Sequence, residues 1–278
     1  MFSQPPLPTK DDEIDWDMVS QDYYRYILSP FSPEMTQSNA RGESRNLLLE
    51  HLKLMDGTQL KQVNVLDMGC GPGNLIPHIA QRISHLTAID QSRAAIELTG
   101  KQASRYSHLC FKGVCSNVLD FSTDKPFDLI ISSNSILPQT RQEVIALFRK
   151  VKNLLQSNGL FIAILPSFDT TLYLRSLWLE HFEKQGYQAS QLQDVMREFN
   201  QSKRIDEQRL SYADDGHNAQ CYHTCESITQ ETLQAGLQLI SPPQKLYYPW
   251  ELTKRFDYGY FPDAPEEIWD WFILATPA

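Results

Sequence analysis

The feature that most constrains the fold is a regular alternation of short apolar runs with amphipathic segments between about residues 62 and 166. The apolar runs have the length of strands, and the segments between them repeat apolar residues at helical spacing. Short apolar strands that alternate with amphipathic helices are typical of a parallel sheet covered on both faces. We therefore predict an α/β fold whose strands are QVNVLDM, HLTAID, HLCFKGV, FDLIISS and LFIAILP.

Helical periodicity also appears outside this core. It predicts helices at about 12–28, 43–54, 169–185 and 189–203. The segment SITQETLQAGLQLI predicts a further helix, capped by Ser227 or Thr229. Two strands follow near 244–250 and 268–275, and we expect them to form an antiparallel hairpin that completes a seven-stranded sheet.

These patterns divide the chain into four expected parts. The apolar core is preceded by a helical cap, is interrupted after its fifth strand by a polar helical insertion, and ends in the helix and hairpin. The parts are an arm and cap at 1–58, a core at 59–166, an insertion or lid at 167–225 and a closing unit at 226–278.

Composition limits the partners. The formal net charge of -9 disfavours binding to nucleic acid, whose binders usually carry a basic face. No apolar run approaches the roughly 20 residues that cross a bilayer, so we expect no membrane partner. The N-terminus lacks the pattern of a signal peptide, and the five scattered cysteines suit a reducing compartment. We therefore expect a cytoplasmic protein. The sequence leaves open its oligomeric state and whether the native chain continues past Ala278.

The stretch VLDMGCGPGNL follows the first core strand and predicts a nucleotide site, because ligands of such sheets bind beyond the carboxyl ends of the strands. A dinucleotide loop needs G-x-G-x-x-G, and here the third glycine place is taken by Asn74. Asp67 would also oppose a pyrophosphate, which prefers a helix N-terminus without a neighbouring negative charge. S-adenosylmethionine carries a sulfonium and an ammonium and no phosphate, so an acid at the strand end favours it.

VLDMGCGPGNL resembles the first motif of the class I S-adenosylmethionine-dependent methyltransferases, V-L-D-x-G-x-G-x-G. The resemblance covers about residues 60–166. It implies a Rossmann-like sheet and methyl transfer that leaves S-adenosylhomocysteine. It also implies that the cofactor lies against the residues of the motif, among which Cys70 is a small residue with no redox role: Asp67, Gly69, Cys70, Gly71 and Asn74.

The same resemblance implies further cofactor contacts. Asp90, at the end of the second strand, is expected to bind the ribose hydroxyls, with Gln91 beside the adenine. The family's usual acid after the third strand is absent, and Ser116, Asn117 and Val118 occupy that place. In the loop after the fourth strand Ser133 and Asn134 are expected beside the methionine part. From the N-terminal cap we expect contacts from Tyr24 and Arg41.

The sequence contains fewer signals for the methyl acceptor than for the cofactor. A carboxylate needs no general base at neutral pH, whereas an amine must first lose a proton. We favour an oxygen acceptor, a carboxylate or hydroxyl of a small molecule or peptide, for example a natural-product precursor. Arginines of the insertion are candidates to pair with it. An amine acceptor and a protein that binds the cofactor without catalysis stay open as alternatives. The candidate substrate-binding residues are aromatic: Tyr23, Trp178, Trp250, Tyr258 and Tyr260.

One segment, QCYHTCES, places Cys221, His223 and Cys225 at every second position. In a strand these side chains share a face, which suits zinc. No fourth ligand lies nearby in the sequence, so we predict no metal. His223 is kept as the candidate general base.

Overall fold

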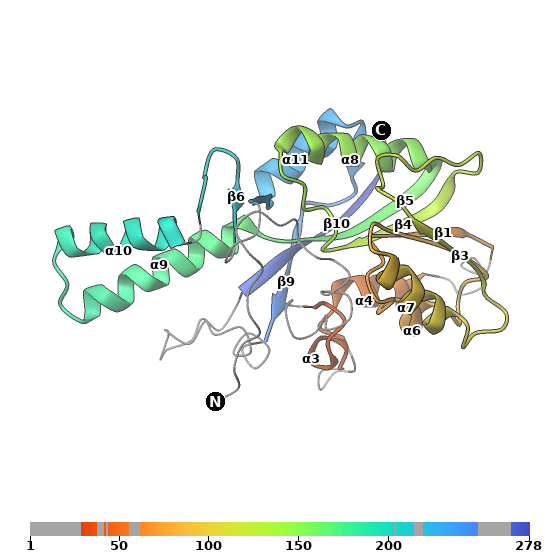
Figure 1. Cartoon of the computed structure of the whole chain (residues 1–278), viewed down its shortest axis with the longest axis horizontal. Coiled ribbons are helices and arrows are strands. Elements are labelled where there is room, and N and C mark those ends of the chain that lie inside the picture. The colour runs from red at the N-terminus through yellow and green to blue at the C-terminus, as the bar shows by residue number, and fades with distance from the viewer. Residues whose placement is uncertain are drawn as a thin grey trace.

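The computed structural model describes residues 29–37, 42, 44–55, 62–202, 204–213, 219–249 and 268–278. A central sheet runs through the molecule with helices packed on both of its faces (Figure 1). This arrangement confirms the α/β, Rossmann-like fold expected from the sequence. The predicted helix at 12–28 lies outside the described residues.

The central sheet has the order β3-β2-β1-β4-β5-β10-β8, with β9 paired to β10. Neighbouring strands from β3 to β5 are parallel, and β10 is antiparallel to β5. The strands are β1 (Asn64–Met68), β2 (His85–Asp90), β3 (Cys110–Cys115), β4 (Phe127–Ser133), β5 (Leu155–Leu165), β8 (Leu237–Leu239), β9 (Gln244–Tyr248) and β10 (Ile268–Pro277).

The strand order reverses at β1. After β1 the chain adds β2 and β3 on one side of it, and then adds β4 on the other side. Leu66 of β1 therefore lies between Thr87 of β2 and Ile130 of β4. In sheets of this kind the ligand binds at such a switch point, beyond the carboxyl ends of the strands. The loop that follows Met68 occupies that place.

The described part of the sheet has eight strands, one more than expected. Its extra member, β8, comes from residues predicted to continue a helix. Gly236 adopts a φ of +79°, which ends helix α11 (Cys225–Gln234), and Leu239 then pairs with Ala275. The N-cap of α11 is Thr224, with Ser227 as its capping-box partner, so the predicted caps Ser227 and Thr229 were wrong.

Alternate residues of the strands face two separate layers of helices. On β1, Val65 packs with α4 and α6, while Leu66 and Met68 pack with α8 and α11. Figure 1 shows these two layers above and below the sheet. The helices besides α11 are α3 (Pro33–Thr36), α4 (Leu47–Leu54), α6 (Ile76–Ile79), α7 (Arg93–Ala103), α8 (Arg141–Leu154), α9 (Phe168–Lys184) and α10 (Ala189–Ser202).

The insertion after β5 is a helical hairpin of α9 and α10, close to the predicted bounds. It projects beyond the sheet on the left of Figure 1. The aromatic rings of Trp178 and Phe199 meet at 5.0 Å and hold the two helices together. A short ribbon of β6 (Ser211–Tyr212) and β7 (Gln220–Cys221) leads back to the core.

Candidate functional site

The glycine loop after β1 is shaped by left-handed backbone and close contacts. Gly69, Gly71 and Gly73 have φ values of +72°, +50° and +82°, which non-glycine residues rarely adopt. A Cβ on Gly69 would lie 2.2 Å from the Cβ of Ser135, which follows β4. Only a glycine therefore lets the loops after β1 and β4 approach this closely.

Helix α7 supports the loop from the other side. The hydroxyl of Thr99 donates to the Gly71 carbonyl at 2.8 Å, and a Cβ on Gly73 would lie 2.9 Å from the Thr99 Cα. Cys70 is buried beside Thr99, and this burial raises the pKa of its thiol well above the usual value. Cys70 is thus held as a neutral, tightly packed thiol.

Asp90, at the end of β2, is tied to the glycine loop. Its carboxylate accepts from the Gly71 amide at 2.9 Å and from the Ser92 amide at 2.9 Å. The next residue, Gln91, is exposed, and its carbonyl accepts from the Cys115 thiol at 3.4 Å. The acid expected to bind ribose is therefore held by one backbone donor of the glycine loop and by one at the start of α7.

The residues after β3 form a short turn. The Ser116 amide donates to the Asp90 carbonyl at 2.9 Å, and the Asn117 side chain accepts from the Leu119 amide at 2.8 Å. Val118 is half-buried and packs against the apolar core between the sheet and α8. The Asn117 side-chain oxygen thus supports its own turn, and contact of the three residues with adenine stays a prediction.

Asp67 is a buried acid that forms no ion pair with any described residue. It is 3% exposed, and burial together with the nearby Asp90 raises the pKa of its carboxyl to about 7. In the part of the chain that the structure describes, its Oδ2 atom has no hydrogen-bond partner. A buried, unpaired carboxylate is costly, so this site suits a bound cation.

Three other buried polar atoms, at the ends of β1 and β4, also have no hydrogen-bond partner within the described ranges. They are the Nδ2 of Asn74, the Oγ of Ser133 and the Oδ1 of Asn134. Native interiors satisfy nearly all such atoms, and exceptions gather where a ligand completes the bonds. The set contains an acid for a sulfonium or ammonium and donors for a carboxylate. It therefore fits the methionine part of S-adenosylmethionine, as Asp90 fits the ribose.

A second buried acid, Asp270, was missed in the sequence. It lies in β10, and its Oδ2 accepts from the Tyr248 hydroxyl at 2.6 Å and from Asn134 Nδ2 at 3.1 Å, while its Oδ1 accepts from the Ser167 amide at 3.2 Å. Burial raises the pKa of its carboxyl to about 6. The available signal was an acid within the apolar strand IWDWFIL.

His223, the candidate base, is fully buried. Its Nε2 lies 3.0 Å from the Ile136 carbonyl, and because a carbonyl only accepts, Nε2 carries the proton. Burial lowers the pKa of the ring to about 3, so the ring is neutral at pH 7. The His223 amide also donates to the Pro166 carbonyl, and the His223 carbonyl accepts from the Phe168 amide. A catalytic role for His223 stays a prediction, and the contacts shown support the loop after β4.

The predicted acceptor residues divide into two groups. Trp178 packs edge-on against Phe182 and Phe199 inside the hairpin, at ring distances of 5.8 and 5.0 Å. Its role in substrate binding stays a prediction. The others lie outside the described residues, together with two of the predicted cofactor contacts: Tyr23, Trp250, Tyr258 and Tyr260 for the substrate, and Tyr24 and Arg41 for the cofactor.

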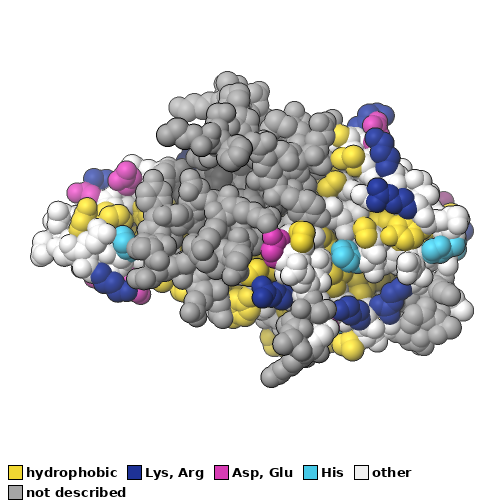
Figure 2. Space-filling view, turned by 90° about the horizontal axis from the view of Figure 1, so that it is seen from below, with side chains coloured by type: hydrophobic (Ala, Val, Ile, Leu, Met, Phe, Trp, Pro, Cys, Tyr) yellow, Lys and Arg dark blue, Asp and Glu magenta, His cyan; other side chains and the backbone are white. Residues whose placement is uncertain are grey.

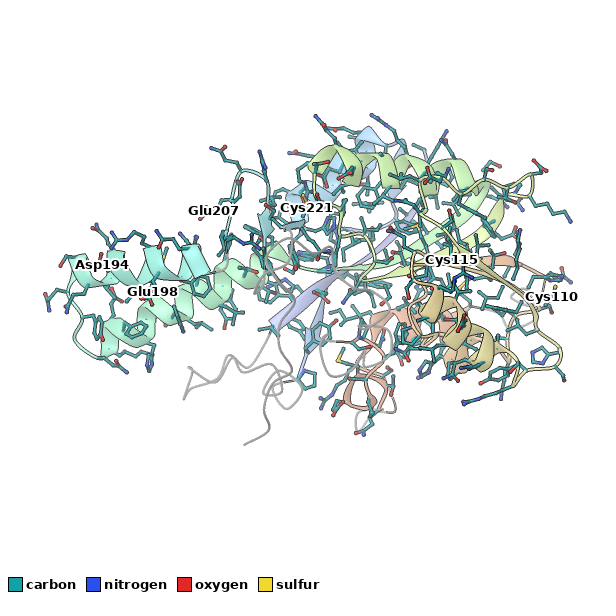
Figure 3. The ribbon with its side chains drawn as sticks, in the orientation of Figure 1. Cys110, Cys115, Asp194, Glu198, Glu207 and Cys221 are labelled. Atoms are coloured by element: carbon teal, nitrogen blue, oxygen red, sulfur yellow. The ribbon has the colours of Figure 1, made fainter. Side chains whose placement is uncertain are left out.

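The five cysteines are free thiols. Cys221 lies well apart from Cys110 and Cys115, which end the edge strand β3 (Figure 3). In the part of the chain that is described, no group of three or more His, Cys, Asp and Glu side chains is placed to hold a metal ion. Within the same ranges, no helix combines the length and apolarity needed to pass through a bilayer.

Residues 65–159 match the family model described as a methyltransferase domain. A curated relative, (S)-tetrahydroprotoberberine N-methyltransferase of Eschscholzia californica, is 29% identical over 103 residues, which are 36% of this chain and 28% of the relative. A second, probable enzyme of that kind from Papaver bracteatum is 29% identical over 98 residues, which are 34% of this chain and 26% of the relative. The chain thus spans about a quarter of the length of these relatives.

Solved structures share the fold at low sequence identity. A SAM-dependent methyltransferase of Methanosarcina mazei aligns with a TM-score of 0.56 and 13% identity, over 82% of this chain and 95% of that one. The magnesium protoporphyrin IX methyltransferase of Synechocystis, solved with bound S-adenosylhomocysteine, aligns with a TM-score of 0.52 and 11% identity, over 95% of each chain. Residues 65–159 therefore form a methyltransferase domain, and the glycine loop and the sheet order agree with the Rossmann-like fold of these S-adenosylmethionine-dependent methyltransferases.

Proposed function

We propose that the protein transfers a methyl group from S-adenosylmethionine to a small-molecule acceptor. The observation that carries this proposal is the set of buried, unpartnered polar atoms at the ends of β1 and β4, around Asp67 and Ser133. These atoms adjoin a glycine loop that is already tied to Asp90. A built site with open hydrogen-bonding positions supports ligand binding there.

The cofactor supplies an activated methyl group on its sulfonium, and the chain's residues hold it. In the proposal Asp90 accepts from the ribose hydroxyls, and Gln91 with the Ser116–Val118 turn flanks the adenine. Asp67, Asn74 and Ser133 take the charged groups of the methionine part. Gly69 and Gly71 let the backbone approach the ligand, with Cys70 packed behind it. The chain's main contribution is to orient the acceptor at attack distance and to exclude water.

On the face shown in Figure 2, basic side chains of the described residues lie next to acidic and apolar ones. Together with the net charge of -9, this supports a small-molecule acceptor. A natural-product precursor as acceptor and a cytoplasmic location belong to the same proposal, and the free cysteines support the latter.

The structure offers fewer observations in favour of an oxygen acceptor than in favour of the cofactor. It relied partly on arginines of the insertion to pair with a carboxylate. In the structure Arg175 is ion-paired with Glu207 and Arg197 with Asp194, so both already have acidic partners. An amine acceptor has a specific observation in its favour, namely the buried acid Asp270 at the same edge of the sheet.

The proposed function is tested with S-adenosylmethionine labelled on its methyl group and a mixed panel of small amines, alcohols and carboxylic acids. Label transferred to any acceptor in the panel supports catalysis. Binding of S-adenosylhomocysteine without transfer to any acceptor supports the alternative of a cofactor-binding protein without catalysis. A protein that binds neither form of the cofactor refutes both.

A further inference from the structure

Four segments distant in the sequence meet at the carboxyl edge of the sheet. Asn134 follows β4, Ser167 follows β5, Tyr248 ends β9, and Asp270 lies near the start of β10. All three partners donate hydrogen bonds to the Asp270 carboxylate, at 2.6 to 3.2 Å. We refer to Asp270, Asn134, Tyr248 and the Ser167 amide as the Asp270 cluster.

The cluster holds a carboxylate without a cation. Asp270 is buried, and no Lys or Arg within the described residues forms an ion pair with it. Three neutral donors stabilise its charge only in part, since burial still raises the pKa of the carboxyl to about 6. A buried charge without a counter-ion is costly unless a cation completes the site.

Asn134 adds a second acceptor to the same place. Its backbone is fixed in the left-handed region, at a φ of +52°, by a bond from its amide to the Ile164 carbonyl. Because its Nδ2 donates to Asp270, the amide group is turned so that Oδ1 points away from the carboxylate. This Oδ1 is buried and has no hydrogen-bond partner among the residues that the structure describes. The cluster thus offers a negative charge and a free acceptor oxygen, and both call for N–H donors.

The cluster also adjoins the cofactor loop. Ser135, the residue after Asn134, donates to the Met68 carbonyl at 2.6 Å and lies against Gly69. Met68 and Gly69 begin the loop that we assign to the cofactor. A group bound to Asn134 and Asp270 is therefore next to the end of the site where the methionine part is placed.

Resting on the function proposed above, we propose that the methyl acceptor is an amine, and that Asp270 and Asn134 bind its nitrogen. The ammonium form enters as the counter-ion of Asp270 and loses one proton to this carboxylate. The nitrogen lone pair then forms the new C–N bond as the C–S bond breaks, and the electron pair of that bond goes to sulfur. The positive charge passes from sulfur to nitrogen, and the methylated ammonium again pairs with Asp270 once the carboxylate has released its proton to water.

The test uses the whole chain and three probes with one carbon skeleton: 2-phenylethylamine, 2-phenylethanol and phenylacetate. Binding is measured by calorimetry on protein saturated with S-adenosylhomocysteine. The amine is expected to bind at least about tenfold more tightly than either oxygen compound, because only it forms a charge-assisted bond with the carboxylate. Equal or tighter binding of the alcohol or the acid overturns the inference, as does binding of none of the three.

Variants test whether the preference for the amine depends on Asp270 and Asn134. Asp270→Asn keeps the side-chain volume and removes the charge, so the amine should lose its preference. Asn134→Gly keeps the left-handed backbone accessible and removes Oδ1, and it serves if Asp270→Asn does not fold. The matched control is Asp169→Asn, since Asp169 is a half-buried acid at the start of α9 whose carboxylate accepts from the Cys225 amide. An amine preference that survives in both Asp270→Asn and Asn134→Gly would contradict the inference.

The saturation step keeps the two proposals apart. If S-adenosylhomocysteine does not bind, the proposed function fails before any acceptor is added. If it binds and the amine shows no preference, only the assignment of the Asp270 cluster fails.

Discussion

The Gly71 amide donates a hydrogen bond of 2.9 Å to the carboxylate of Asp90, so the glycine loop and the acid at the end of β2 form one unit. The other oxygen of Asp90 accepts from Ser92 at the start of α7. The acid therefore has two tasks, since it fixes the loop and it is the proposed partner of the ribose.

Replacing Asp90 with Ala should weaken binding of S-adenosylhomocysteine by at least about tenfold, from the loss of charge-assisted bonds worth roughly 1.5–3 kcal/mol. Calorimetry on the purified protein measures this. Glu97→Ala is the control, because Glu97 is an exposed acid on the adjacent helix α7 and carries the same charge. Equal affinities of Asp90→Ala and the unchanged chain would rule out the ribose role.

Gly69→Ala should unfold more easily and bind the cofactor poorly. The added methyl group would meet the Cβ of Ser135 at 2.2 Å, and alanine at the φ of +72° is strained besides. Gly186→Ala separates the two causes, because Gly186 has a φ of +87° with no atom within 4 Å of an added Cβ. It should cost only the backbone strain of about 1–2 kcal/mol and leave cofactor binding unchanged. Urea unfolding and calorimetry measure both effects, and similar losses in the two variants would show that the contact with Ser135 is unimportant.

Cofactor binding should depend on pH through Asp67. In the free protein the pKa of this carboxyl is raised to about 7, so below that pH it is mostly protonated and neutral. A bound sulfonium or ammonium favours the charged form. Binding should thus release a proton at pH 6, and affinity should fall by up to about tenfold per unit as the pH drops below 7. Calorimetry between pH 5.5 and 8.5 tests this, with Asp67→Asn expected to give a flatter profile. An identical pH profile for the two proteins would show that Asp67 is not the titrating group.

The ion pair of Arg141 with Glu231 should be important for stability. It joins α8 to α11, and Arg141 also donates to the Tyr222 carbonyl. Removing one partner of a buried pair leaves a buried charge, so Arg141→Ala should lower the free energy of unfolding by about 3–5 kcal/mol. Arg197→Ala breaks the exposed pair with Asp194 and should cost less than about 1 kcal/mol. Denaturant unfolding checks the contrast, and equal losses would refute the assigned difference.

The sequence predicted the core well because its signals are local. Strand and helix lengths follow from apolar periodicity, and the loop of Gly69 to Gly73 follows a short motif. The extra strand β8 was missed because it has only three residues, which are too few to show the apolar alternation of a strand. Its pairing depends on Gly236 ending the helix and on Ala275 being available far along the chain.

The Asp270 cluster could not be predicted for a related reason. Its members come from four segments, and only the pairing of β10 with both β5 and β9 brings them together. Likewise, the packing of Trp178 against Phe199 could not be predicted, because it depends on how the two helices of the hairpin meet. A motif within one loop can be recognised in the sequence. A site whose residues are brought together by the pairing of distant strands cannot.

Calorimetric titration of the whole, unmodified chain with S-adenosylhomocysteine at pH 8 decides whether the glycine loop and Asp90 bind the cofactor. We expect one binding site per chain, with binding lost or weakened at least about tenfold in Asp90→Ala. The absence of any binding to the correctly folded protein would contradict this expectation.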